Sequence, residues 1–191
     1  YLPGPAPRSE YYRLYSWIKG QTMVNRILDL LIQYKAVEFG DFTLASGAKS
    51  KYYIDVKTAI MQPELLSEIA AEVAAKYDFD VVAGVAVGGV PLATAVSLAA
   101  KKPCAIIRAQ AKDHGKAQMV IGSVKGKRVL LIEDVTTSGG SSKYGVDELK
   151  KEGALIETVV TVVDREGGAA DLLGKEGVTL CPLVRASELL N

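Results

Sequence analysis

The chain has 191 residues, of which 49% are hydrophobic and 24% are charged, and its formal net charge is +1. This length is most simply that of one domain with a sizeable core, and the composition excludes a disordered protein. The near-zero net charge argues against a broad nucleic-acid-binding surface, which needs clustered excess lysine and arginine.

The terminal and apolar segments predict neither a leader nor a membrane span. Residues 1–21 are rich in proline and tyrosine and lack an apolar signal-peptide core, so we expect an extension or tail. Residues 81–100 carry no charge, but Pro91 and several glycines interrupt them, which argues against a membrane span. Cys104 and Cys181 lie in apolar segments without a Cys-x-x-Cys spacing, which predicts buried free thiols in a reducing cytoplasm.

The first part of the sequence predicts two helices around a pair of short strands. Apolar residues recur at helical spacing from Thr22, a candidate N-cap, to about Lys35, which predicts an amphipathic helix. Residues 38–57 hold two strand-like runs around the Ser46-Gly47 turn, and this pattern alone favours an ordinary hairpin. Residues 63–77 begin with proline and follow a helical apolar pattern, so a second helix should lie on a sheet.

The remaining elements alternate between strand and helix. A strand over 81–87 leads through a glycine turn into a helix over 91–100, and a strand over 103–108 leads into a polar loop over 109–119. The later pattern predicts a strand over 129–132, a helix over 142–152, strands over 158–163 and 178–184, and a short tail helix over 185–191. This alternation indicates an α/β fold with a mainly parallel sheet that binds its ligand at the carboxyl edge.

The most informative stretch is the segment 129–142, which reads VLLIEDVTTSGGSS. It opens with an unbroken apolar run, which predicts a strand buried on both faces. Glu133 and Asp134 follow this run, and residues 136–142 are then small or carry hydroxyl groups. Consecutive backbone N–H groups in such a loop, together with the start of the next helix, form a site for a phosphate.

A ribose 5-phosphate fits this segment, because its ring hydroxyls can donate to the two carboxylates while its phosphate lies in the loop 137–141. The alternative is a strand-to-helix turn in which Asp134 or Ser141 merely caps the helix. The acids, hydroxyls and glycines together exceed what a cap requires, and the glycine motifs of other nucleotide-binding loops are missing from the sequence. We therefore favour the functional interpretation.

The segment resembles the phosphoribosyl pyrophosphate (PRPP) motif of the type I phosphoribosyltransferase family. The resemblance implies the fold of that family in residues 22–191, an α/β fold with a mainly parallel central sheet flanked by helices. It implies a core over about 63–165 and a small N-terminal hood over about 22–57, to which the C-terminal tail is added. The residues that it assigns to PRPP in this stretch are Glu133, Asp134, Val135, Thr136, Thr137, Ser138, Gly139, Gly140 and Ser141.

The resemblance also covers the glycine turn and the metal. It implies that Gly88 and Gly89 contact the pyrophosphate of PRPP through their backbone. It further implies Mg²⁺, which should arrive with PRPP and be held mostly by substrate oxygens and water, without a dedicated protein cage.

The polar loop 109–119 is longer than most connections, and such loops are often functional. Its His114 is the only histidine of the chain, and a lone loop histidine is more often an exposed bystander. Arg108 and the Lys-Asp-His-Gly run 112–115 resemble the family's loop that closes over pyrophosphate, commonly in the site of the other subunit. The resemblance thus implies a homodimer, PRPP binding by Arg108, Lys112 and His114, and catalysis by Lys112, His114 and Asp134.

A second resemblance indicates which base is the substrate. The run FTLASGAKSKYYID resembles the hood of the orotate phosphoribosyltransferases, in which the backbone at Tyr52, Tyr53 and Ile54 lines the pocket for the flat orotate ring. Arg165 at a strand end would by itself suggest a surface ion pair, whereas the family gives this arginine to the orotate carboxylate. With Thr137 in the same pocket, the resemblance implies phosphoribosyl transfer from PRPP to orotate in the cytoplasm, without nucleic-acid or membrane partners.

The sequence departs from relatives at Ala45, Ala48, Gly88 and Ala109, which stand where some of them carry basic side chains. Two alternatives remain open. A phosphoribosyltransferase for adenine, xanthine or uracil would share the segment 129–141 without needing Arg165. A PRPP-sensing regulator that binds nucleic acid would keep the fold, although the near-neutral charge and the 112–115 run count against it.

Overall fold

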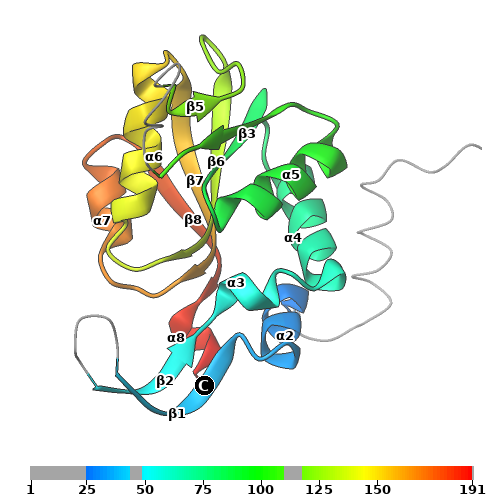
Figure 1. Ribbon diagram of the computed structural model, residues 1–191, viewed down its shortest axis with the longest axis vertical. Coiled ribbons are helices and arrows are strands. Elements are labelled where there is room, and N and C mark those ends of the chain that lie inside the picture. The colour runs from blue at the N-terminus through cyan, green and yellow to red at the C-terminus, as the bar shows by residue number, and fades with distance from the viewer. Residues whose placement is uncertain (1–24, 44–48, 110–117, 191) are drawn as a thin grey trace, which may run out of the picture.

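The computed structural model describes residues 25–43, 49–109 and 118–190. Their centre is a six-stranded sheet in the order β5-β4-β3-β6-β7-β8, in which only β5 runs antiparallel to its neighbour (Figure 1). The strands are β3 (Val81–Val85), β4 (Cys104–Ile107), β5 (Val120–Ile121), β6 (Arg128–Thr136), β7 (Leu155–Asp164) and β8 (Thr179–Arg185). The predicted α/β fold with a mainly parallel sheet is therefore confirmed.

The strand order reverses between β3 and β6. From β3 the chain moves outward to β4, whereas from β6 it moves outward in the other direction to β7 and β8. Parallel strands diverge in this way at a topological switch point, and the crevice at their carboxyl ends is where open α/β sheets bind ligands. The crevice between β3 and β6 is thus the place to look for a site.

Helices cover both faces of the sheet (Figure 1). One face carries α4 (Pro63–Lys76) and α5 (Gly89–Ala100), and the other carries α6 (Gly140–Lys151) and α7 (Ala169–Gly174). Because successive side chains of a strand point to opposite faces, the apolar run of β6 contributes to both cores. Leu130 and Ile132 pack in the core under α4 and α5, and Leu131 packs in the core under α6.

A smaller unit lies beside the carboxyl edge of the sheet (Figure 1). It consists of the antiparallel pair β1 (Val37–Thr43) and β2 (Lys49–Ile54), with the helices α2 (Arg26–Gln33), α3 (Val56–Ala59) and α8 (Ala186–Leu189). Asn25 joins this unit to the C-terminal part of the chain, because its Nδ2 donates to the Leu183 carbonyl at 3.1 Å. Asn25 also caps α2, whereas the predicted cap Thr22 lies outside the described residues.

Tertiary pairing changes several predicted boundaries. The strand predicted over 129–132 continues to Thr136, because residues 133–136 also pair with β7. The helices predicted from 91 and 142 begin at Gly89 and Gly140 instead. The short elements α3, β5 and α7 were not predicted, since each is too short for a periodic pattern to be recognised.

Two predictions from composition can be compared with the described residues. No helix among them is long and apolar enough to cross a bilayer. Cys104 and Cys181 are free thiols as predicted, but both are only half-buried.

Candidate active site

Two adjacent carboxylates at the end of β6 occupy the switch point. Glu133 is 3% exposed and Asp134 is 4% exposed. Their side chains contact different elements, since neighbouring residues of a strand point to opposite faces. Ser141 in the first turn of α6 donates its Oγ hydrogen to Glu133 Oε1 at 2.9 Å. On the other side, Lys57 Nζ of α3 lies 3.0 Å from Asp134 Oδ2 and forms an ion pair with it.

The two carboxylates differ in their electrostatics. Burial raises the pKa of Glu133 to about 7, against the lowering effect of the hydrogen bond from Ser141. Asp134 Oδ2 is buried, and its partner among the described residues is the Lys57 ammonium at 3.0 Å, which leaves it with further acceptor capacity. A buried carboxylate oxygen with unused acceptor capacity is costly unless a ligand supplies a donor. Such groups mark candidate functional sites.

The glycine turn after β3 lies directly against Asp134. A Cβ atom added to Gly88 would stand 2.5 Å from both Cγ and Oδ2 of Asp134. One added to Gly89 would stand 2.9 Å from the Ile132 carbonyl oxygen. A side chain at position 88 would displace the Asp134 carboxylate, and one at position 89 would collide with the backbone of Gly84 and Ile132. The structure thus brings the turn predicted to contact pyrophosphate together with the acidic pair.

The predicted phosphate loop connects β6 to α6. Val135 and Thr136 belong to the strand, whereas Thr137, Ser138, Gly140 and Ser141 are exposed. Gly139 is the N-cap of α6 and has φ +84°, a conformation that favours glycine. The exposed amino terminus of this helix presents unpaired N–H groups and the positive end of its dipole, as an anion site requires.

Arg165 lies beside this loop. Its backbone N–H donates to the Thr136 carbonyl at 2.8 Å, and a Cβ on the nearby Gly167 would stand 2.7 Å from Thr137 Cγ2. The chain after β7 is therefore packed on the phosphate loop. Two residues predicted for orotate, Arg165 and Thr137, are brought to the same place.

The aromatic run predicted to face orotate lies in β2, immediately before α3. Tyr52 is half-buried, Tyr53 is 45% exposed, and Ile54 is buried in the core. The Tyr53 ring lies 5.7 Å from the Phe42 ring, centroid to centroid. The described contacts connect this run to the acidic pair through α3.

The base of the predicted closing loop is fixed to the sheet. The backbone N–H of Arg108 donates to the Met119 carbonyl at 2.9 Å, and Tyr144 Oη donates to the Arg108 carbonyl at 2.7 Å. Arg108 Nε is buried without a hydrogen-bond partner among the described residues. Lys112 and His114 lie outside the described residues.

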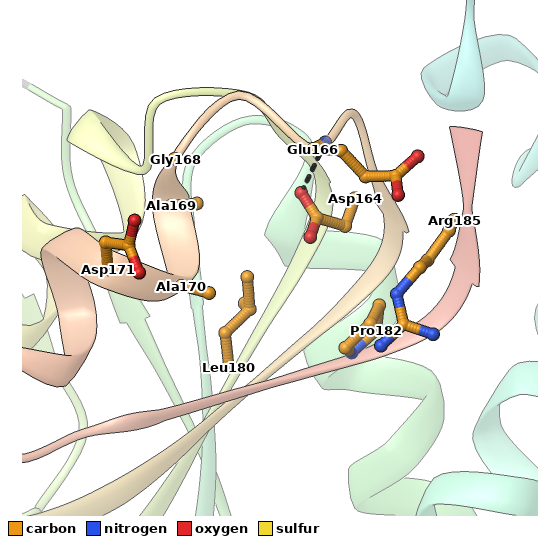
Figure 2. A pocket seen from close by; sticks show the side chains of 9 residues that line it. All are labelled: Asp164, Glu166, Gly168, Ala169, Ala170, Asp171, Leu180, Pro182 and Arg185. Carbon is orange, nitrogen blue, oxygen red and sulfur yellow. Dashed lines mark hydrogen bonds between the residues drawn. The ribbon is translucent and has the colours of Figure 1, made fainter. Parts of the chain in front are cut away.

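A cavity of about 340 Å³ opens elsewhere, at the ends of β7 and β8 (Figure 2). Asp164, Glu166 and Asp171 line it together with a single cation, Arg185, and Asp164 Oδ1 accepts the backbone N–H of Glu166 at 2.9 Å. None of the residues predicted for PRPP or orotate lines it. Its predominantly acidic lining repels phosphate groups, so the crevice at Asp134 remains the candidate site.

Lys57 is the site residue that the sequence reasoning missed. It stands three positions beyond the aromatic run, and nothing in its neighbourhood distinguishes it from a solvated surface lysine. Only the packing of α3 against β6 brings its ammonium to Asp134.

Comparison with known proteins identifies the family to which the chain belongs. Residues 58–179 match the phosphoribosyl transferase domain family, so the chain belongs to the phosphoribosyltransferases. The orotate phosphoribosyltransferase of Methanocorpusculum labreanum is 85% identical over 168 residues, which cover 88% of this chain and 99% of that protein. At this identity the chain belongs, within the class, with the orotate phosphoribosyltransferases.

Solved structures agree with this placement. The orotate phosphoribosyltransferase of Aeropyrum pernix shares 32% identity at a TM-score of 0.76, over 86% of this chain and 96% of that one. The Mycobacterium tuberculosis enzyme, solved in complex with PRPP, shares 29% identity at a TM-score of 0.71, over 87% and 98% of the two chains. The type I phosphoribosyltransferase fold predicted from the sequence is confirmed.

Proposed function

We propose that the chain transfers the 5-phosphoribosyl group from PRPP to orotate, giving orotidine 5′-monophosphate and pyrophosphate in pyrimidine biosynthesis. The observation that carries this proposal is the buried Asp134 carboxylate at the switch point, whose Oδ2 has unused acceptor capacity. It belongs to β6, the strand that leads to the phosphate loop, and the Gly88 turn lies directly against it. The close similarity to orotate phosphoribosyltransferases supports the choice of base.

PRPP would bind across the carboxyl end of β6. Its ribose hydroxyls donate to Asp134 and Glu133, and its 5-phosphate accepts hydrogen bonds from the N–H groups of residues 137–141 at the start of α6. The pyrophosphate lies toward Gly88 and Gly89, where the absence of side chains lets the backbone approach closely.

Magnesium is proposed to come with PRPP. Among the described residues, no group of three or more His, Cys, Asp or Glu side chains is arranged to hold a metal ion. The Asp134 carboxylate would suit a hydrogen bond from a water molecule of a hydrated Mg²⁺. When bound, the ion neutralises charge on the pyrophosphate oxygens.

The reaction exchanges one bond at the anomeric carbon of the ribose for another. The bond to the pyrophosphate oxygen breaks with its electron pair on the leaving group, and a ring nitrogen of orotate forms the new bond and gives up its proton. We propose that Arg165 holds the orotate carboxylate beside Thr137, with the backbone at Tyr52 and Ile54 along the ring edge.

The charge on the leaving group needs cations. We propose that Arg108, Lys112 and His114 provide them, with the 109–119 loop acting in the other subunit of a homodimer. Both ends of this loop are anchored, because the Arg108 N–H donates to the Met119 carbonyl and Tyr144 Oη donates to the Arg108 carbonyl. The cytoplasm is the proposed location, as the two free thiols favour a reducing compartment.

Enzyme assays with different bases test the proposal. Orotate, uracil, adenine and xanthine would each be supplied with PRPP and Mg²⁺, and consumption of the base would be followed by its ultraviolet absorbance. We expect turnover with orotate alone, because Arg165 beside the phosphate loop suits a base with a carboxylate. Preferential use of another base would overturn the proposal, and salt-dependent nucleic-acid binding without turnover would support the regulator instead.

A further inference from the structure

The turn predicted to face pyrophosphate has no side chain of its own. Gly88 contributes only backbone, and the Asp134 carboxylate fills the space that a Cβ atom would need. This part of the site therefore places a negative group where the negatively charged pyrophosphate is proposed to bind. A cation is needed to offset the repulsion.

Lys57 reaches this place from the opposite side. Its Nζ lies 3.0 Å from Asp134 Oδ2, the same oxygen that lies 2.5 Å from the position of a Gly88 Cβ. The ammonium of Lys57 and the Gly88 turn thus share one carboxylate oxygen. The carboxylate is buried, whereas the Lys57 side chain is 62% exposed, so its ammonium remains accessible to a ligand.

The backbone around Lys57 is held firmly. Val56 and Ala59 of α3 are each 1% exposed and anchor the helix in the core. Asp55 caps the helix, because its Oδ1 accepts the Thr58 N–H at 3.1 Å and its Oδ2 accepts the Thr58 hydroxyl at 2.7 Å. A short helix fixed at both ends directs Lys57 toward the crevice, and contact with Asp134 raises the lysine pKa, which keeps it cationic.

We infer that Lys57 is a PRPP-binding residue whose ammonium supplies, from α3, the positive charge that the Gly88 turn lacks. In the free protein it balances Asp134. When the ribose hydroxyls of PRPP donate to Asp134, the ammonium contacts the pyrophosphate oxygens while it stays beside the carboxylate. The inference rests on the proposed function, and it adds a residue and a role that the PRPP motif does not contain.

The test compares K57M, K57R and K51M with the wild-type chain. K57M keeps the length and the apolar stem of the side chain but removes its charge, and K57R keeps the charge. K51M is the matched control, because Lys51 is another lysine of the β1–β2 unit, with a side chain that is 84% exposed and paired with Asp41. For each variant, the KM for PRPP and the inhibition constants of pyrophosphate and ribose 5-phosphate would be measured.

We expect K57M to raise the KM for PRPP and the inhibition constant of pyrophosphate roughly tenfold to a hundredfold. This is the effect expected when one charge-assisted hydrogen bond is lost. The inhibition constant of ribose 5-phosphate and the KM for orotate should stay near wild type. K57R should lie closer to wild type than to K57M, and K51M should equal wild type in every constant.

Three results would overturn the inference. Equal weakening of pyrophosphate and ribose 5-phosphate would mean that Lys57 acts only by positioning Asp134. Unchanged constants in K57M would show that Lys57 does not bind PRPP. An equal rise of the constants in K51M would show that any positive charge on the β1–β2 unit has the same effect as Lys57. A wild-type chain without phosphoribosyl transfer to orotate would instead refute the proposed function, which keeps the two failures distinct.

Discussion

The two ends of the parallel strands, here called the amino edge and the carboxyl edge of the sheet, both carry acidic residues. Those at the amino edge are exposed and paired with several cations, whereas those at the carboxyl edge are buried. At the amino edge, the Arg128 guanidinium contacts Asp78 at 2.7 Å and Asp80 at 2.8 Å, and the Arg128 backbone N–H donates to Asp80 at 2.9 Å. Lys102 adds an ion pair to Asp78 at 3.2 Å. At the carboxyl edge, Asp134 is buried and its partner is a single lysine.

Local environment sets the properties of these acids. Hydrogen bonds from Arg128 lower the pKa of Asp80 to about 2, whereas burial raises the pKa of Glu133 to about 7. Protein partners occupy the charges of the amino edge, and exposed ion pairs of this kind contribute little to stability. The carboxyl edge keeps its acids buried with acceptor capacity left over. A ligand can donate hydrogen bonds to this remaining acceptor capacity.

The largest expected effect is that of removing the Asp134 charge. D134N should lower kcat/KM for PRPP at least about a hundredfold, because an amide offers the ribose hydroxyls one acceptor and no charge. D80N makes the same chemical change at the amino edge and should leave kcat/KM unchanged. Steady-state kinetics on both folded variants check this, and equal losses in the two would erase the distinction between the edges.

The next effect concerns the base. R165A should reduce orotate turnover roughly tenfold to a hundredfold, since the orotate carboxylate loses its cationic partner. The KM for PRPP should barely change, and the preference for orotate over uracil should narrow. If R165A instead weakened PRPP and left orotate untouched, Arg165 would belong to the phosphate side of the site.

A smaller loss is expected from crowding Asp134 without changing its charge. G88A places a Cβ atom 2.5 Å from the Asp134 carboxylate, which must move, so kcat/KM for PRPP should fall roughly tenfold or more. The control is G174A in α7, where a Cβ atom would meet nothing within 4 Å. Wild-type kinetics in G88A would show that the position of this carboxylate is not critical.

The smallest expected effect is on the pH dependence of the unfolding free energy. Glu133 at the carboxyl edge and Asp80 at the amino edge change this free energy in opposite directions as pH rises. The pKa of Glu133 is raised from 4.5 to about 7, so its contribution favours the folded state at low pH and fades as pH rises from 4.5 to 7. The pKa of Asp80 is lowered from 3.8 to about 2, so its contribution is present above pH 3.8 and is lost as pH falls toward 2.

Urea unfolding of E133Q and D80N at a series of pH values separates the two windows. E133Q should flatten the pH dependence of the unfolding free energy between pH 4.5 and 7 and leave the acid limb unchanged. D80N should flatten only the acid limb below pH 3.8. The reverse assignment of the two limbs would contradict the burial argument for Glu133.

The same comparison shows what sequence patterns could predict. The apolar run of β6 and the helical spacing of α4 are local signals, so the parallel sheet and the carboxyl-edge position of Asp134 were predicted. That Glu133 and Asp134 contact different elements also follows from strand alternation, although the sequence reasoning treated them as one pair.

Other features depend on contacts between distant segments. The ion pair of Lys57 with Asp134 joins residues on α3 and β6, and no spacing in the sequence encodes it. The close approach of Gly88 to Asp134 likewise arises from the packing of the β3 turn on the neighbouring strand. The glycine at position 88 is visible in the sequence, whereas the cation that lies beside Asp134 is not.

The central claim is that the carboxyl edge binds PRPP through the buried Asp134 carboxylate, which has acceptor capacity beyond its ion pair with Lys57. Calorimetric titration of PRPP with Mg²⁺ into the wild-type chain, D134N and D80N tests it most directly, because binding is measured without the reaction. The account predicts tight binding to the wild type and to D80N, and binding to D134N that is weaker by at least about tenfold. Equal affinity of all three proteins for PRPP would contradict it.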